Sequence, residues 1–383
     1  GANNTAVGYS ALQANTTGTE NVALGANALD ANTTASVNTA VGFNAGTTNT
    51  TGNLTAFGGY AAQAQTTGTN TTALGSFSLY ANTTGANNTA VGSAFGATRG
   101  VLQDNTTGGN NTAMGVAALS ANTTASNNTA VGYASLTANT TGASNTAIGF
   151  LSMSASTTGG NNTAVGQYSL TANTTGYQTV SIGDESLAAS TTGAANVAVG
   201  YRALKTNTTA SNNTAVGFQA LLANTTGTEN TAVGALSLDA CTTGNNNTAM
   251  GHNSLSTNIL SDHNVAIGND ALATHNTGSS IDAYNVAVGS GAGFAVTTGK
   301  QNTFIGGNAG DANTTADNNT AVGFNALTAN TTGASNVSVG AGALKSNTTA
   351  SNNTAVGLEA LRQNTTGASN SAYGLYSLLT NTT

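Results

Sequence analysis

A five-residue phrase, Asn-Thr-Ala-Val-Gly, stands at residues 4–8 and returns along the whole chain at a fixed distance. Its glycine occurs 22 times, and 18 of the 21 intervals between successive glycines have the same length, 17. A fixed short period indicates one supersecondary unit stacked on copies of itself. We therefore predict a single continuous repeat array over residues 1–383, in place of the two or three globular domains that the length alone suggests. The other three intervals have lengths of 16, 23 and 21, from Gly42 to Gly58, Gly92 to Gly115 and Gly268 to Gly289.

When the repeats are aligned on residues 4–20, equivalent positions form columns, and two of these columns are apolar. Thr5-Ala6-Val7 alternates between β-branched residues and alanine, which is typical of a short strand. The second column is leucine in most copies and predicts another short strand, Ala11-Leu12-Gln13. Gly8 marks a tight corner between the strands that needs a positive φ or a close backbone approach. We expect the Val7 and Leu12 columns to form the core, and the alanine face to lie outside, where chains meet.

Two short strands and two turns in each repeat predict one coil of an all-β parallel β-solenoid, or β-roll, with about 22 coils and a 17-residue repeat. Asn, Thr and Gly dominate each unit and are poor helix formers, while the strict apolar columns argue against disorder. Each coil rises by about 4.8 Å, one strand spacing, so equivalent residues stack. Stacked asparagines can form an amide ladder. We predict such a structural ladder at Asn4, Asn21, Asn38, Asn88, Asn111 and Asn128.

Composition excludes several classes of partner. Charged residues make up only 5% of the chain, and six basic residues form no phosphate-binding stripe, so nucleic acid is not an expected partner. No apolar run approaches the ~20 residues that span a membrane. Cys241 stands alone in a column of asparagines, which excludes an internal disulfide framework and leaves only an intermolecular disulfide open. Both termini fall inside a repeat, so we expect a segment of a longer chain.

Titratable residues predict neither an enzyme nor a metal site. Asp184-Glu185 is the only adjacent acidic pair, and no stacked acidic column supplies the convergent carboxylates of a glycosidase. Three histidines fall within two coils, near two aspartates, which raises a metal site as an alternative. They occupy different positions on the coil perimeter, so we favour solvated loop histidines at His252, His263 and His275. No cofactor-binding motif is present.

The two long intervals predict loops that bulge from the stack near residues 98–103 and 279–284, because the register resumes after each. In solenoids such excursions can carry contacts, and neutral loops are the alternative. Tyrosines close to the corner can stack on sugars or pack in a core or interface, and we favour packing for Tyr9, Tyr133 and Tyr201.

The Asn-Thr-Thr segment creates a column of N-glycosylation acceptors, Asn-x-Thr. The functional interpretation is a glycan-coated rod, in which sugar replaces charge as the solubilising shell. The alternative is that Asn and Thr suit this turn and its ladder, and the column breaks at Gln65, Ser156, Ser190 and Cys241. Further acceptors arise where asparagine precedes the ladder position, as in Asn3-Asn4-Thr5. The acceptors of the main column are Asn15, Asn32, Asn49, Asn82, Asn105, Asn122, Asn139, Asn173, Asn207, Asn224, Asn313, Asn330, Asn347, Asn364 and Asn381.

The abundance of threonine raises ice binding as a further alternative. A flat threonine array needs Thr-x-Thr, so that both hydroxyls face the same side of a strand. Thr16 and Thr17 are adjacent and would point to opposite faces, which argues against an ice-binding surface.

Several copies of the repeat resemble a known adhesin phrase. Asn264-Val265-Ala266-Ile267-Gly268-Asn269-Asp270-Ala271 is similar to the Ser-Val-Ala-Ile-Gly-x-x-Ala/Ser phrase of trimeric autotransporter adhesin heads, as are residues 21–25, 196–200 and 285–293. The resemblance implies left-handed parallel β-rolls that trimerise side by side and bind host matrix or other cells. The repeat here is longer than that of the family, by the Asn-Thr-Thr-Gly turn. The array also resembles repeats of phage-type tail fibres and bacterial surface fibres.

Together these patterns favour a structural component of an extracellular surface fibre or filament, with or without a glycan coat. The thin core and the repeated small-residue face predict self-association, as a homotrimer or an end-to-end filament. The alternatives are an adhesin head that binds matrix, cells or glycans, and an ice-binding solenoid. We expect an extracellular or cell-surface location, no cofactor, and host or matrix surfaces or glycans as outside partners.

Overall fold

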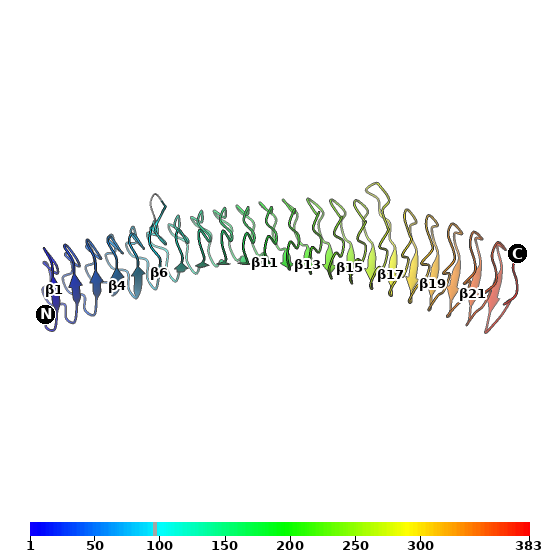
Figure 1. Ribbon diagram of the computed structural model, residues 1–383, viewed down its shortest axis with the longest axis horizontal. Helices are drawn as coiled ribbons and strands as arrows, with labels where there is room; N and C mark the ends of the chain where they lie inside the picture. Colours follow the sequence, from blue (N-terminus) through cyan, green and yellow to red (C-terminus); the bar gives the residue numbers. More distant parts are fainter. Residues whose placement is uncertain (95–97) are drawn as a thin grey trace. The chain divides into compact units, whose positions relative to one another are not determined.

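The computed structural model describes residues 1–94 and 98–383. These residues form two compact units, Gly1–Ala194 and Ala195–Thr383. Each unit is a parallel β-solenoid in which one short strand recurs in every coil, and the described residues contain no helix (Figure 1). The predicted all-β parallel β-solenoid of about 22 coils with a 17-residue period is confirmed.

The strands occupy the Thr-Ala-Val position of the repeat, where β-branched residues suit a pleated surface. In the first unit they are β1 (Thr5–Val7), β2 (Val22–Leu24), β3 (Thr39–Val41), β4 (Leu54–Phe57), β5 (Thr71–Leu74), β6 (Thr89–Val91), β7 (Thr112–Met114), β8 (Thr129–Val131), β9 (Thr146–Ile148), β10 (Thr163–Val165) and β11 (Val180–Ile182). In the second they are β12 (Val197–Val199), β13 (Thr214–Val216), β14 (Thr231–Val233), β15 (Thr248–Met250), β16 (Val265–Ile267), β17 (Val286–Val288), β18 (Thr303–Ile305), β19 (Thr320–Val322), β20 (Val337–Val339), β21 (Thr354–Val356) and β22 (Ser371–Tyr373).

Within each unit, every strand pairs in parallel with the strand of the next coil, residue for residue. Ala6 of β1 pairs with Ala23 of β2, for example, and Ala215 of β13 pairs with Ala232 of β14. The register also holds across a long interval, because β6 and β7 pair in the same way as their neighbours although additional residues separate their corner glycines. Extra residues therefore leave the stack and return to it without shifting the columns.

The second strand predicted at Ala11-Leu12-Gln13 is wrong, because this segment is a turn. Ser10 has φ 54° and Leu12 has φ 55°, so both lie in the left-handed region, which a strand does not use. Throughout the Leu12 column φ lies between 47° and 60°. These left-handed residues turn the chain sharply, which lets so short a repeat close a coil that has only one strand.

The strands place alanine inside the coil and the β-branched residues outside, which is the reverse of the prediction for this face. Ala130 of β8 is fully buried, whereas Thr129 and Val131 on either side of it are half-buried at the surface. The Leu12 column lies inside as predicted, and Leu136 has no exposed surface. The alanine face is therefore core and is not available to another chain.

The width of the coil explains why alanine points inward. In β18 the alanine position is taken by the buried Phe304, and the leucine positions that face its ring are glycines. A Cβ on Gly293 would lie 2.9 Å from that ring, and one on Gly310 would also collide with it. The alanine and leucine columns thus face each other across an interior that holds one large side chain per layer at native packing density.

The repeat glycine forms the corner after each strand, as predicted. Gly8 has φ 138°, and a Cβ there would lie 2.5 Å from the carbonyl oxygen of Gly25 in the next coil. Both the positive φ and the close approach of two backbones require a residue without a side chain.

Glutamate substitutions at two positions of one coil should separate interior from surface. Leu136→Glu places a carboxylate in a fully buried column and is expected to lower the free energy of unfolding by ~4 kcal/mol. Val131→Glu leaves the carboxylate on the outward face and is expected to cost less than about 1 kcal/mol. Thermal unfolding followed by circular dichroism measures both losses. Equal losses would contradict the inward alanine described above.

Candidate functional site

Two columns of asparagine run through the coils, and the first is the predicted ladder column beside each strand. Asn111 Oδ1 accepts a hydrogen bond from the backbone N–H of Asn128 at 3.0 Å, and Asn111 Nδ2 donates to the carbonyl oxygen of Ala125 at 2.9 Å. The same contacts join Asn4 to Asn21 and Asn21 to Ala35. Apart from Asn4 and Asn370 in the terminal coils, which are half-buried, the asparagines of this column are fully buried. The column therefore links successive coils mainly from side chain to backbone.

The second column contains Asn15 and its equivalents, the residues predicted as glycan acceptors. Asn122 Nδ2 donates to Asn105 Oδ1 at 2.7 Å and to the carbonyl oxygen of Ala125 at 3.0 Å. The same two bonds recur at Asn139, Asn330 and Asn347. This column is an amide-to-amide ladder of the kind found in stacked β structures. The side chains are fully buried except in the terminal coils, at Asn15 and Asn381.

The burial of this column limits where an N-linked sugar can be attached to the folded chain. An N-linked sugar replaces one hydrogen of Nδ2, and the two Nδ2 bonds of Asn122 are both internal. Glycosylation of the column stays a prediction, and it would require addition of the sugar before the coil closes. The acceptors that precede the ladder position lie differently, because Asn87, Asn110 and Asn127 are exposed at the outer corner. Among the described acceptors outside the terminal coils, those at this outer corner are exposed, whereas those of the interior column are buried.

The interior ladder is interrupted where its column carries a shorter residue. Ser156 follows Asn139, and neither Ser156 Oγ nor Asn139 Oδ1 has a hydrogen-bond partner among the residues that the structure describes. Ser190 and Cys241 leave the preceding asparagine oxygens unpaired in the same way. Gln65 also leaves the preceding oxygen, Asn49 Oδ1, unpaired. Its own amide is satisfied, because Nε2 donates to the Gly68 carbonyl oxygen at 2.8 Å and Oε1 accepts from Asn82 at 3.1 Å. Each unpaired buried group costs about 1–3 kcal/mol.

Restoring asparagine at Ser156 should therefore stabilise the first unit. Ser156→Asn supplies a donor for Asn139 Oδ1 and an acceptor for Asn173, and the backbone there already repeats that of the asparagine coils. We expect the free energy of unfolding to rise by about 1–2 kcal/mol, measured by chemical denaturation. Ser154→Asn, two residues earlier and half-buried at the surface, is the control and should change little. A loss of stability in Ser156→Asn would contradict the ladder as the reason for burying this column.

The outward face of the strands is uncharged and partly apolar. Neither the Thr5 column nor the Val7 column contains a charged residue in any coil. The side chains of Leu24, Met114 and Ile148 in the first unit are 47%, 44% and 39% exposed, and that of Met250 in the second unit is 40% exposed. An uncharged face that exposes apolar side chains is a candidate interaction surface.

Aromatic side chains border this face just beyond the corner glycine. Tyr133 and Phe150 stack with ring centroids 5.4 Å apart, and Tyr201 and Phe218 stack at 5.6 Å. Their half-exposed rings cover one another, which supports packing as the main role of these tyrosines. Tyr9, in the first coil, is 81% exposed.

The three histidines do not converge. His252 is exposed, His263 Nδ1 lies 2.9 Å from Asp282 Oδ1 at the surface, and His275 is fully buried in the interior asparagine column. The prediction of a solvated loop is wrong for His275, because the Asn-Thr-Thr column points inward. Within the described ranges no three His, Cys, Asp or Glu side chains are grouped to hold a metal ion.

The inserted residues of the second unit are held at their base by an exposed cluster. Asp282 accepts hydrogen bonds from His263 and, at 3.2 Å, from the Tyr284 hydroxyl, and the rings of His263 and Tyr284 stack 5.0 Å apart. The bond to Asp282 and its negative charge raise the pKa of Tyr284. The loop emerges between β16 and β17, with residues 278–280 exposed (Figure 1).

Part of the segment predicted to bulge at residues 98–103 lies in the stack. Val101 and Leu102 are fully buried in the regular interior columns. Residues 95–97 in this interval lie outside the described part of the chain.

Cys241 is a free and fully buried thiol. Burial raises its pKa to about 12, and the nearby negative charge of Asp262 acts in the same direction. A thiol that stays protonated and inaccessible is unreactive. The folded second unit therefore does not present Cys241 for a disulfide with another chain.

Acid should destabilise the second unit through His275. Neither ring nitrogen reaches a hydrogen-bond partner in the described structure, and burial lowers the pKa from 6.5 to about 4, with a small opposing effect of the Thr297 backbone. Between these two pH values the unfolded chain binds a proton that the folded chain does not. Stability is therefore complete above pH 6.5 and falls as the pH drops towards 4, by about 3 kcal/mol in all.

Denaturant unfolding at pH 7, 5.5 and 4.5 measures this loss. His275→Asn restores the residue typical of the column and should remove the His275 part of the pH dependence. His252→Asn, at an exposed position, is the control and should keep it. An identical pH dependence in wild type and His275→Asn would contradict the assignment.

No helix in residues 1–94 or 98–383 is long and apolar enough to cross a membrane. No protein-family model matches the sequence, and no curated protein matches it either. The class that the fold defines is a repeat β-solenoid with a 17-residue period.

Proposed function

We propose that this chain is a structural segment of an extracellular fibre in which copies associate side by side. The observation that carries the proposal is that, within each unit, strand pairing joins each coil to the next in the same register. The asparagine columns and threonine bonds such as Thr123 Oγ1 to the Thr140 carbonyl oxygen, at 3.1 Å, add to this pairing in most coils. Such an array extends by adding identical layers, which is what a spacer requires.

Composition and resemblance support the extracellular part of the proposal. With 5% charged residues, the surface is made of neutral Asn, Thr and Ser side chains instead of ions. The repeat phrase is similar to those of trimeric autotransporter heads and of phage-type and bacterial surface fibres. Any N-linked coat would sit on the outer corner, at positions such as Asn87, Asn110 and Asn127, which are exposed in the fold.

The outward strand face is the surface that we assign to self-association. It replaces the alanine face in that role, because the alanines are core. This face carries no charged residue and exposes Leu24, Met114 and Ile148. A symmetric contact between copies would therefore bury apolar area without burying an unpaired charge. The resemblance to adhesin heads favours three copies.

Ice binding is not supported by the threonine geometry. Thr16 Oγ1 donates to the carbonyl oxygen of Thr33 at 3.0 Å, and this bond recurs along the Thr16 column, so those hydroxyls are engaged with the protein. Of the two threonine columns in this segment, that of Thr17 is the more exposed.

Sedimentation velocity on the whole chain tests the proposed contact. We expect the wild type to sediment as an oligomer, and Val131→Glu combined with Val165→Glu to sediment as a monomer with an unchanged circular dichroism spectrum, because adjacent copies would then bury like charges. The control is Thr124→Glu with Thr141→Glu, which adds the same charge at exposed positions outside the strands. A wild type that stays monomeric, or a valine double variant that still associates, would contradict the proposal.

A further inference from the structure

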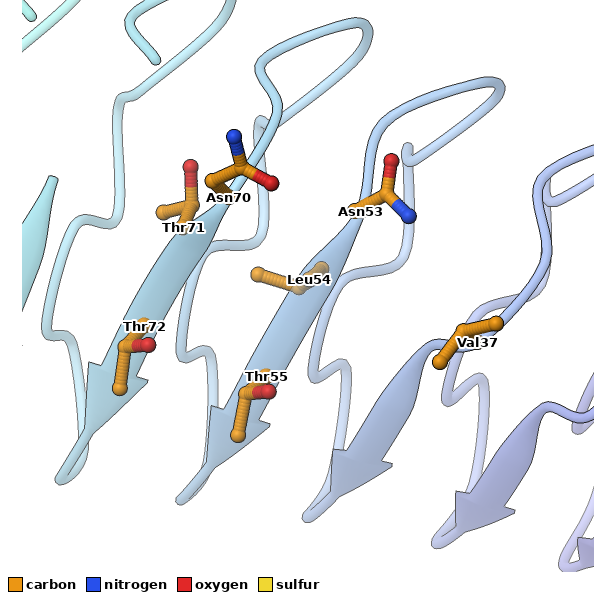
Figure 2. Close-up of a pocket in the computed structure, with 7 residues that line it drawn as sticks. All are labelled: Val37, Asn53, Leu54, Thr55, Asn70, Thr71 and Thr72. Atoms are coloured by element: carbon orange, nitrogen blue, oxygen red, sulfur yellow. The ribbon is translucent and has the colours of Figure 1, made fainter. Parts of the chain in front are cut away.

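The 16-residue interval leaves a notch in the outer corner of the first unit. Between Gly52 and Leu54 this coil has one residue, Asn53, where the regular coils have two. In the neighbouring coils the residue before the ladder position is left-handed, with φ 62° at Val37 and 55° at Asn70, whereas Asn53 is not left-handed. The missing residue opens a cavity of about 350 Å³ (Figure 2). Its lining includes Val37, Asn53, Leu54, Thr55, Asn70 and Thr72.

The floor of the notch is closed and regularly paired. Leu54 and Thr71 occupy the ladder positions of two successive coils, and each is only 2% exposed. They extend β4 and β5 by one residue and pair with each other. Asn38 Oδ1 accepts from the Leu54 backbone N–H at 2.7 Å, so the asparagine column ends against this floor. The notch is therefore part of the fold and not a local opening of the chain.

One wall of the notch carries the open end of a chain of hydrogen-bonded amides. Asn70 Nδ2 donates to Asn87 Oδ1 at 3.1 Å, Asn87 to Asn110 at 3.0 Å, and Asn110 to Asn127 at 3.2 Å. Asn53 does not continue this row, because its Nδ2 points to the Ser36 carbonyl oxygen at 3.5 Å. No donor within the described structure reaches Asn70 Oδ1. Amides in a row polarise one another, which makes this terminal oxygen a strong acceptor.

Further unpaired polar groups face the same space. In Figure 2 the Thr55 and Thr72 side chains lie side by side on adjacent strands and project from the same face of the sheet. Neither hydroxyl has a hydrogen-bond partner in the part of the chain that is described, and the same is true of the Asn70 backbone N–H. A hydroxyl both donates and accepts. The notch thus offers at least one strong acceptor, two hydroxyls and one free donor.

An exposed aromatic ring borders these groups. Phe57 lies on β4 two residues after Thr55, on the same outward face and about 7 Å along the strand, and it is 42% exposed. Every lining residue is neutral. A phosphate or carboxylate would find no Arg or Lys here, and a metal ion would find no carboxylate. A ligand with many hydroxyls and an apolar ring face would match the amide, the hydroxyls and the phenyl ring together.

We infer that the notch binds two adjoining neutral hexose units of a glycan, with the hydroxyls of one unit on Asn70 Oδ1 and the hydroxyls of Thr55 and Thr72, and with the ring of the next unit against Phe57, which lies beyond the cavity lining on the same face. The cavity of about 350 Å³ is at the lower end of the range of roughly 300–1,000 Å³ for small-ligand sites, which suits one or two sugar rings. The site lies within one unit and needs no second copy. Thr55, Thr72 and Phe57 stand on the outward strand face that we assign to self-association, so a glycan and a second copy would compete for this surface. Binding is therefore measured on the Val131→Glu, Val165→Glu variant as well as on the wild type.

Binding is tested on the whole chain with neutral oligosaccharides. Maltotriose, cellotriose, mannotriose and lactose are the probes, followed by saturation-transfer NMR and titration calorimetry, with sialyllactose as the anionic comparison. We expect at least one neutral probe to bind. Phe57→Val, which installs the residue typical of that column, and Asn70→Gly, which keeps the left-handed backbone, should each weaken binding at least tenfold.

Controls distinguish the notch from a general effect on the fold. Tyr373→Val makes an aromatic-to-valine change in the same column, and Asn161→Gly makes the same change at an outer corner of a regular coil, so both should bind like the wild type. Insertion of one threonine between Gly52 and Asn53 together with Leu54→Asn restores a coil of regular length, and it should abolish binding without lowering the melting temperature. The inference is overturned if no neutral probe binds, or if the filled variant binds as the wild type does.

Discussion

The bond from the backbone N–H of one ladder asparagine to the Oδ1 of the asparagine a coil earlier is the interaction on which the register depends. At this position the chain passes through a left-handed residue into its strand, and ordinary strand pairing has not yet begun. The side-chain amide supplies the acceptor that the backbone lacks, and its Nδ2 binds a turn carbonyl of the next coil. Where Leu54 and Thr71 replace asparagine, β4 and β5 begin one residue earlier and pair there themselves. In both cases the buried backbone N–H at the ladder position has a hydrogen-bond acceptor, and this requirement determines the local structure.

The sequence determines the coil number, the corner glycines and the buried leucine column, because each depends only on the period or on one residue type. It does not determine which face of Thr-Ala-Val points inward, since alternation is the same for either choice. The opposite wall of the coil decides this. One clue was present in the sequence: the single large residue of the alanine column, Phe304, falls beside two glycines in the leucine column, Gly293 and Gly310. Volume exchanged between two columns implies that they face each other inside the coil.

Sequence reasoning also predicts the wrong side for the asparagine of the Asn-Thr-Thr segment, which is interior. Asparagine is mostly exposed in folded proteins, but stacking lets an amide pair with the amides of the neighbouring coils, and this offsets the cost of burial. His275, Ser156 and Cys241 then become interior residues without the partners that asparagine has, although from the sequence they look like tolerated surface changes. The sequence does not indicate the left-handed turn at Leu12 either, because leucine rarely adopts a left-handed backbone conformation. Only the glycines that replace it, such as Gly46, hint at the positive φ.

A stack that repeats one residue type per column presents the same groups at each coil. A ligand bound to the regular surface would therefore find equal binding free energy at every coil. Distinct recognition requires a position where the repeat changes. The long intervals change it by adding residues outside the stack, and these leave the columns intact. The short interval removes a corner residue, and this ends the exposed amide row at Asn70 and uncovers Thr55 and Thr72 while the strands stay paired. A deletion in a repeat array can therefore create a unique site at little cost to the fold, because the strand pairs beside the corner stay intact while the outer-corner backbone bond made in regular coils is absent at Asn70.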